Sequence, residues 1–245
     1  MRLIYRNIRV NTDVASLTIL IGLPAMYLIF FGYGFQSLAS GSSYLSFLTP
    51  GIMAFQAVMA GTVGGSMLWA DRRWGMLAQL LVGPFSRLEY LLGIMFTAVI
   101  FGLAGALLML GVAYLLLHGI AISPLMGLAM LGTIALGSIF FGSLLLYISA
   151  RVKSNNTYNS IQVLTLFFVN FASTVFYPLS GNLPAVLHAL FLVNPLTYVA
   201  DTVRGAAQGQ LTATNGLEMI VLSAETVVAL VFAVRAYLRS DVSME

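Results

Sequence analysis

The sequence predicts an all-α polytopic membrane protein, and three observations lead to this fold class. First, 60% of the 245 residues are hydrophobic and only 8% are charged, against roughly 25% charged residues in an ordinary soluble domain. Second, the apolar residues gather in continuous runs of about twenty, the length of a helix that crosses a bilayer. Third, nearly all cationic residues fall in alternate connections between these runs. A soluble enzyme is therefore excluded.

The apolar runs number six, and each is long enough to cross hydrocarbon as a helix. A helix satisfies its own backbone hydrogen bonds in lipid. The runs are continuous and do not alternate apolar with polar residues, so the strands of a membrane barrel are not expected. Residues 1–245 are therefore predicted to form a single transmembrane domain, with spans at about residues 15–35, 45–69, 90–117, 125–149, 158–177 and 216–234.

The cationic residues predict the orientation of these spans. Arg204 alone lies on one side, and the other side holds Arg2, Arg6, Arg9, Arg72, Arg73, Arg87, Arg151, Lys153, Arg235 and Arg239. The positive-inside rule places the cation-rich connections in the cytoplasm, together with both termini. We therefore expect a multi-pass protein of the cell (plasma) membrane with a cytoplasmic N and C terminus.

Composition also limits the chemistry of the chain. Cysteine is absent, so a disulfide framework, a thiolate nucleophile and a sulfur metal site are excluded. The net charge of +3 would favour nucleic acid as the partner of a soluble protein. Here the charge follows the membrane topology, so the bilayer is the expected partner and nucleic acid is not.

Two local patterns predict how the helices are arranged. The spacings Gly61-x-x-x-Gly65 and Ser138-x-x-x-Gly142 would allow helices to approach closely. The stretch from Leu3 to Val10 mixes apolar and basic residues. This mixture is typical of a helix that lies on the anionic inner leaflet before the first span.

The inner connection after the second span is long and amphipathic. One helical face carries Trp74, Leu77, Leu80 and Leu81. Asp71 suits the start of a helix, and Gly83-Pro84 suits its end. The sequence therefore predicts a short amphipathic helix at the inner membrane surface. Such a helix either floats on lipid or docks a cytoplasmic partner.

The outer connection from Pro178 to Asn215 is also unusual. Its apolar stretch, Ala185–Val193, has nine residues between Pro184 and Asn194-Pro195. Nine helical residues rise only about 13.5 Å, too little to cross a bilayer. We expect a re-entrant or interfacial half-helix, followed by a second amphipathic piece from Leu196 to Gln208 that forms an outer cap or contacts substrate.

Two acidic residues, one in the outer connection and one in the sixth predicted span, predict specific contacts. Asp201 and Arg204 are spaced i, i+3, which permits a local ion pair. Glu225 is the one carboxylate deep in a predicted span. Because a charge there is costly, Glu225 should face protein or a wet cavity. It either contacts cargo or binds an amide or hydroxyl of the fifth span, such as Gln162, Thr165 or Asn170.

At these two connections the chain resembles the membrane subunit of the ABC type-2 exporters, a family that includes drug-resistance, nodulation-factor and polysaccharide export permeases. The first motif reads Asp71-Arg72-Arg73-x-Gly75-x-Leu77-x-x-Leu80-Leu81-x-x-Pro84. The second reads Asn194-Pro195-Leu196-Thr197-Tyr198-x-x-Asp201-x-x-Arg204-Gly205. The likeness covers essentially the whole chain. Family members often have Glu-Arg-Glu-x-Gly-Thr at the first motif, where this chain has Arg73 and Met76 in place of the second acid and the threonine.

The resemblance implies that membrane transport and ATP hydrolysis are carried out by different subunits. Asp71–Pro84 would be the coupling helix that sits in a cleft of a separate ABC ATP-binding subunit, and the short outer helices would be a re-entrant pair. Two copies of the chain would join two ATPase subunits, which would hold ATP and Mg²⁺. The chain itself has no Gly-x-x-x-x-Gly-Lys-Ser/Thr loop. It is therefore expected to be a permease without an ATPase site, exporting a hydrophobic or amphiphilic substrate.

Two other functional classes fit the sequence less well. An intramembrane hydrolase needs a nucleophile with a nearby base, or metal ligands at suitable spacing. His118 and His188 are the chain's histidines, both near the predicted outer surface, and no catalytic or metal-binding motif is present. A secondary transporter or channel independent of an ATPase is the alternative left open. Its ionisable residues would be expected at the midplane, where Glu225 is the candidate.

Overall fold

The computed structural model describes residues 2–35, 44–116, 122–179 and 184–240, and in these ranges the chain forms helices and no strand. The helices are α1 (Arg2–Val10), α2 (Val14–Gly34), α3 (Tyr44–Arg73), α4 (Met76–Val82), α5 (Arg87–Leu116), α6 (Pro124–Arg151), α7 (Asn155–Phe171), α8 (Ala185–Val193), α9 (Pro195–Ala207) and α10 (Ala213–Leu238). The predicted all-α fold class is confirmed.

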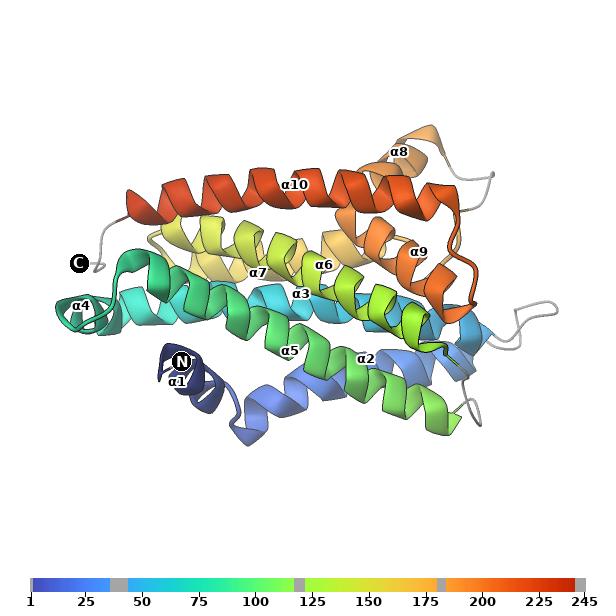
Figure 1. Ribbon diagram of the computed structural model, residues 1–245, viewed down its shortest axis with the longest axis horizontal. Coiled ribbons are helices and arrows are strands. Elements are labelled where there is room, and N and C mark those ends of the chain that lie inside the picture. Colours follow the sequence, from blue (N-terminus) through green and yellow to red (C-terminus); the bar gives the residue numbers. More distant parts are fainter. Residues whose placement is uncertain (1, 36–43, 117–121, 180–183, 241–245) are drawn as a thin grey trace.

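The long helices run roughly side by side along the molecule (Figure 1). We term the end that carries α1, α4 and the last turn of α10 the basal end, and the end where α3, α6 and α10 begin the distal end. Helix α3 forms the centre, packed by α5, α6, α9 and α2, and α10 packs mainly on α6 and α9. Because α3 is surrounded, most of its side chains are buried from Leu45 to Leu68.

Four helices among the described residues, α3, α5, α6 and α10, are long and apolar enough to cross a membrane. The pair α8 and α9 brings the number to five if the two are counted as one broken span. Helix α2 covers the first predicted span, but its described apolar part, Thr18–Gly34, is shorter. Helix α7 has 17 residues. The structure thus confirms a multi-pass bundle, and the number six remains a prediction.

The fifth predicted span reached Tyr177, and this boundary is wrong because α7 ends at Phe171. Polar side chains donate hydrogen bonds to the last backbone carbonyls of the helix. The Ser173 hydroxyl donates to the Asn170 carbonyl at 2.6 Å. The Asn194 amide donates to the carbonyls of Val169 and Ala172, at 2.7 Å each. Such side-chain partners satisfy groups that a helix end would otherwise leave bare.

A glycine seam joins α3 to α6. It consists of Gly61 and Gly65 in α3 and Gly137 in α6. A Cβ atom on Gly61 would lie 2.7 Å from the Phe141 carbonyl carbon, and one on Gly65 would lie 2.8 Å from the Leu145 Cβ. On Gly137 it would lie 3.0 Å from the Ala57 Cβ in α3. The close approach predicted from Gly61-x-x-x-Gly65 is confirmed, since no side chain fits at these positions.

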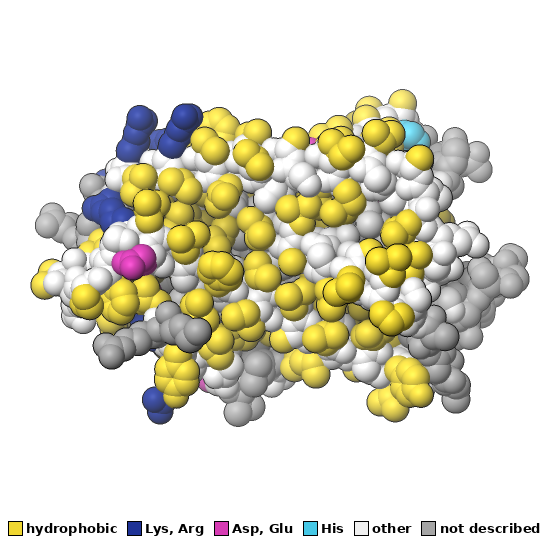
Figure 2. Space-filling view, viewed as in Figure 1, with side chains coloured by type: hydrophobic (Ala, Val, Ile, Leu, Met, Phe, Trp, Pro, Cys, Tyr) yellow, Lys and Arg dark blue, Asp and Glu magenta, His cyan; other side chains and the backbone are white. Residues whose placement is uncertain are grey.

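The surface has the polarity of a membrane protein. Figure 2 shows hydrophobic side chains covering the face between the two ends, while Lys and Arg side chains gather at the basal end. The described cations of the predicted inner connections lie at the ends of α1, α3, α5, α6, α7 and α10 that meet there. The alternation read from the sequence therefore corresponds to one charged end of the bundle.

Candidate functional site

The predicted coupling segment is not one helix but the end of α3 followed by a separate α4. Gly75 has a φ of 68° and lies between the two helices. A residue in this left-handed conformation commonly ends a helix, and glycine adopts it without steric cost. Asp71 therefore lies in the last turn of α3 and not at the start of the amphipathic helix. The predicted stop is confirmed, because α4 ends at Val82 immediately before Gly83-Pro84.

Asp71 is the centre of a basal polar cluster with Arg6 and Tyr90. Two guanidinium nitrogens of Arg6 donate to the two carboxylate oxygens of Asp71 at 2.9 and 2.6 Å. The Tyr90 hydroxyl donates to the Asp71 Oδ2 at 2.7 Å. Donating hydrogen bonds to Asp71 raises the pKa of Arg6, although burial opposes the shift. This Asp71 cluster ties α1, α3 and α5 together, and its paired geometry is that of strong ionic hydrogen bonds.

The two arginines of the first motif point to different places. Arg72 is buried, and its guanidinium donates to the backbone carbonyl of Ser149 near the end of α6. Arg73 is exposed, and its guanidinium lies 5.4 Å from the centre of the Trp74 ring. Arg72 therefore serves the packing of α3 on α6, and Arg73 is available at the surface.

Helix α4 uses its leucines to hold itself on the bundle. Leu77 is only 1% exposed, and Leu80 and Leu81 are half-buried against the same apolar cluster. Trp74, by contrast, is 75% exposed and precedes the helix. The four apolar residues expected on one face therefore differ in burial: the three leucines pack on the bundle, and Trp74 is exposed. What remains exposed, here named the α4 outer surface, consists of Arg73, Trp74, Met76, Gln79, Val82 and Pro84.

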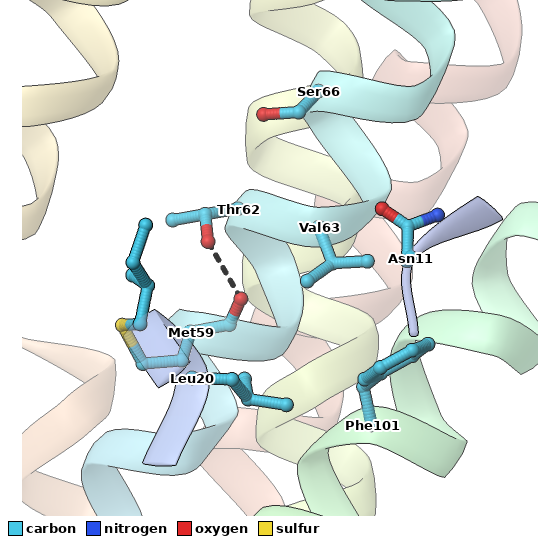
Figure 3. Close-up of a pocket in the computed structure, with 8 residues that line it drawn as sticks. Asn11, Leu20, Met59, Thr62, Val63, Ser66 and Phe101 are labelled. Carbon is cyan, nitrogen blue, oxygen red and sulfur yellow. Dashed lines mark hydrogen bonds between the residues drawn. The ribbon is translucent and has the colours of Figure 1, made fainter. Parts of the chain in front are cut away.

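A cleft of about 170 Å³ opens beside α3 in the basal half of the molecule (Figure 3). It is lined by Asn11, Ile19, Leu20, Met59, Thr62, Val63, Ser66 and Phe101. The Thr62 hydroxyl donates to the Met59 carbonyl at 2.7 Å. The Ser66 hydroxyl accepts a hydrogen bond from the Gln162 amide at 3.0 Å. This α2/α3 cleft combines apolar walls with a few hydroxyl and amide groups, a lining suited to an amphiphile.

At the distal end, α8 and α9 form a bent pair with an angle of 74°. The bend falls at Asn194, whose side chain caps α9 by accepting from the Leu196 N–H at 3.0 Å. Pro195 follows in the first helical position, where its missing N–H costs nothing. The Tyr198 hydroxyl donates to the Leu192 carbonyl and so joins the two helices. Two short outer pieces were predicted here, and two short helices are present.

Arg204 is the centre of a second polar cluster. It forms an ion pair of 2.6 Å with Asp201, at the spacing that the sequence indicated. It also donates to the carbonyls of Thr174 at 2.8 Å and Phe47 at 3.4 Å, and its guanidinium lies 4.0 Å from the centre of the Phe47 ring. The Thr174 hydroxyl donates to Asp201 at 2.8 Å. This Arg204 cluster joins α9 to α3 and to the turn after α7.

Glu225 lies in α10 with its Oε2 atom buried and without a hydrogen-bond partner. The side-chain amides of the fifth predicted span form hydrogen bonds with groups other than Glu225. The Gln162 amide donates to Ser66, and the Asn170 amide donates to the Leu166 carbonyl. The expected bond to either amide is therefore wrong, because α7 packs against α3 and α6 while α10 packs on α6 and α9.

The described residues contain no group of three or more His, Asp or Glu side chains that could hold a metal ion. His118 lies outside the described residues, and His188 is in α8. The residues that sequence reasoning missed are Arg6, Tyr90 and Phe47. Each contacts a predicted site residue from a distant part of the chain, so no local pattern reveals it.

A bundle of apolar helices with one cationic end and a short helix anchored at that end defines a polytopic membrane protein. The family model described as "ABC-2 type transporter" matches residues 2–207, from α1 to the end of α9. The chain therefore belongs to the ABC-2 type transporter family, as the transmembrane permease domain, which is not itself catalytic. The chain matches no curated protein.

Proposed function

We propose that the chain is the membrane subunit of an ATP-driven exporter that moves a hydrophobic or amphiphilic substrate outward. ATP and Mg²⁺ would be held by a separate ABC ATP-binding subunit. The observation that carries this proposal is the α4 outer surface. It presents Arg73 and Trp74 just before α4 and Val82 at the end of α4, which buried Leu77 fixes to the bundle. A rigidly held, exposed apolar and basic patch favours a protein partner over free lipid contact.

The orientation follows from the charge distribution. The basal end carries the described Lys and Arg residues other than Arg204, and the positive-inside rule assigns such an end to the cytoplasm. Both termini and α4 would then face the ATPase, in the cell (plasma) membrane. The bent pair α8–α9 would be a re-entrant element at the outer side.

A second copy of the chain is the other proposed partner, in a 2:2 complex with the ATPase. Helix α7 supports this assembly, since Tyr158 and Asn170 are its buried residues and most of the remainder is partly or fully exposed. Its exposed side chains include amides and hydroxyls such as Asn159 and Ser160 as well as Phe167. Polar groups on a membrane helix are more favourable at an interface between helices than in lipid.

The cargo class follows from the α2/α3 cleft. Its apolar walls and its Thr62 and Ser66 hydroxyls favour a molecule with an apolar body and few polar groups. A long sugar chain would need many hydrogen-bonding partners along its path. Efflux of a fluorescent amphiphile that stops with vanadate would agree with ATP-driven export. Efflux that instead depends only on an ion gradient would favour a secondary transporter.

The docking proposal is tested by co-purification of a co-expressed ATP-binding subunit with the tagged chain. Trp74→Asp and Val82→Asp place charge on the α4 outer surface without touching the leucines below it. We expect at least tenfold less ATPase in the purified complex. Val10→Asp is the matched control, since Val10 is also exposed at the basal end but lies in α1. Undiminished ATPase with both α4 variants would disprove docking there.

A further inference from the structure

Helix α2 contains a proline where it borders the α2/α3 cleft. Pro24 lies inside α2 and has no N–H, so it cannot give the Leu20 carbonyl the hydrogen bond of a regular helical turn. Leu20 is one of the residues that line the cleft (Figure 3). Because helices bend most sharply where a proline interrupts their hydrogen bonds, the backbone of α2 is weakest directly beside the cleft.

The Leu20 carbonyl receives a hydrogen bond from another helix. The side-chain amide of Gln56, in α3, donates to it over a long distance of 3.5 Å between nitrogen and oxygen. Gln56 is 0% exposed, and its Oε1 atom has no hydrogen-bond partner. A buried polar group that is only partly satisfied is unfavourable. The contact between α2 and α3 at this point is therefore weakly held.

Gln56 lies just beyond the distal end of the cleft. Met59 and Val63, which line the cleft, follow Gln56 by three and seven residues, so the three side chains share one face of α3. The Gln56 amide also fills space beside α5, because a Cβ atom on Gly105 would lie 2.5 Å from the Gln56 Oε1. A displacement of the neighbouring part of α2 would make this amide part of an enlarged cleft.

The two parts of α2 on either side of the proline are held differently. In the distal part, which follows the proline, the centre of the Tyr27 ring lies 5.5 Å from that of Phe176 and 5.9 Å from that of Phe55 in α3. The basal part, residues 14–23, contains no aromatic side chain and borders the cleft. Ring contacts add to the stability of packing, so the distal part is fixed more firmly than the basal part.

From these observations we propose that α2 bends at Pro24, so that its basal part opens and closes the α2/α3 cleft. The hydrogen bond from Gln56 to the Leu20 carbonyl is the latch of the closed form. The distal part stays in place, and opening brings water or a polar group of a ligand to the Gln56 amide. A role of this movement in transport rests on the proposed function, whereas the bend is a property of the chain alone.

Thiol labelling of the purified full chain, in nanodiscs and without an ATPase, measures the opening. Met59→Cys places a thiol in this cysteine-free chain at a position that lines the cleft and is 4% exposed. N-ethylmaleimide should modify this thiol, and Pro24→Ala should slow the modification at least tenfold, because alanine supplies the missing backbone N–H. Alanine also favours a helix, so the fold should be retained. An equal rate with and without Pro24→Ala would overturn the hinge.

Two controls separate bending from other effects. Pro50→Ala replaces the proline inside α3 and should leave the rate at position 59 unchanged. Ala57→Cys places a fully buried thiol toward α6, since a Cβ on Gly137 would lie 3.0 Å from the Ala57 Cβ. It should react at least tenfold more slowly than the thiol at position 59. Equal rates at the two positions, or an equal slowing of both by Pro24→Ala, would report unfolding of the whole chain and contradict the proposal.

The latch is tested by a double-mutant cycle on the same labelling rate. Gln56→Met keeps a long, unbranched side chain and removes the amide. With Pro24 in place the Leu20 carbonyl then loses its described donor, whereas with Pro24→Ala it keeps the donor of residue 24. Gln56→Met should therefore raise the rate by a severalfold larger factor in the chain with Pro24, because effects of the amide unrelated to Leu20 cancel in the cycle. Additive effects of the two substitutions would refute the latch.

Discussion

The Asp71 cluster at the basal end and the Arg204 cluster at the distal end hold helices together by opposite means. At the basal end a buried acid accepts hydrogen bonds from the side chains of Arg6 and Tyr90. At the distal end Arg204, whose side chain is 12% exposed, donates to Asp201 and to two backbone carbonyls. The basal partners are side chains that mutation can remove one at a time, whereas the distal partners include backbone groups that remain in every variant.

This difference predicts which cluster is more sensitive to loss of its centre. Without Arg204, the Thr174 carbonyl loses a hydrogen-bond donor, and the Asp201 carboxylate keeps Thr174 as its remaining described partner. Asp71 without Arg6 still accepts from Tyr90. The Arg204 cluster should therefore be the more fragile of the two.

The largest effect is expected for Arg204→Met. Removing one partner of a buried charge pair typically costs about 3–5 kcal/mol. Because the Asp201 side chain is 27% exposed, the lower end of this range is expected, and chemical denaturation of the purified chain in detergent measures it. Asp201→Leu added to Arg204→Met should recover part of the loss, because it removes the uncompensated carboxylate. Arg239→Met, at an exposed position at the end of α10, is the control. A loss no greater than that of the control would mean that the cluster does not hold α9.

An intermediate effect is expected for Arg6→Gln. The ionic hydrogen bonds to Asp71 are lost, at about 1.5–3 kcal/mol for a bond to a charged group, and α1 should separate from α5. Leu3 and Gly93 allow a direct measurement in this cysteine-free chain, because a Cβ on Gly93 would lie 3.3 Å from the Leu3 Cβ. This is close to the separation in a disulfide.

Leu3→Cys with Gly93→Cys should therefore cross-link on mild oxidation, as read from the loss of thiol labelling. Arg6→Gln should lower the cross-linked fraction several-fold, while Arg9→Gln, an exposed neighbour in α1, should leave it unchanged. A cross-link that forms equally well without Arg6 would show that apolar packing alone docks α1.

The smallest effect is expected for Tyr90→Phe. The ring remains stacked on Tyr237, with 6.0 Å between the ring centres, and one hydrogen bond to Asp71 is lost. A cost of about 1–2 kcal/mol follows, visible as a modest shift of the denaturation midpoint. Tyr114→Phe at an exposed position in α5 should shift it by less than half as much. A shift as large as that of Arg204→Met would reverse the ranking of the two clusters.

The same contrast explains what the sequence could predict. Asp201 and Arg204 are three residues apart, so helical periodicity alone brought them together. Arg6 and Asp71 are 65 residues apart, and their pairing depends on how α1 folds back onto α3. The fold class and most of the helices were accessible because apolar length and charge alternation are local properties, which a single sequence displays.

Local signals were also present and misjudged. Gly75 follows Arg72 and Arg73, a basic last turn and a glycine that together are typical of a helix end. Asp71 could thus have been assigned to α3. Ser173 and Thr174 similarly indicated that α7 would not continue to Tyr177. The α2/α3 cleft gave no signal, because its walls come from α2, α3 and α5, whose packing no single stretch determines.

The glycine seam has a mechanical consequence. Gly61, Gly65 and Gly137 leave no clearance between α3 and α6, and a packed contact of this kind resists gradual deformation. We therefore expect α3 and α6 to tilt together as one rigid unit. Since α4 follows directly from the end of α3, a displacement of α4 would be transmitted through this unit to the distal end. The other helices would have to adjust during such a motion. Helix α7, which makes few contacts with the bundle, and the connections of α1 and α2 would take up this adjustment.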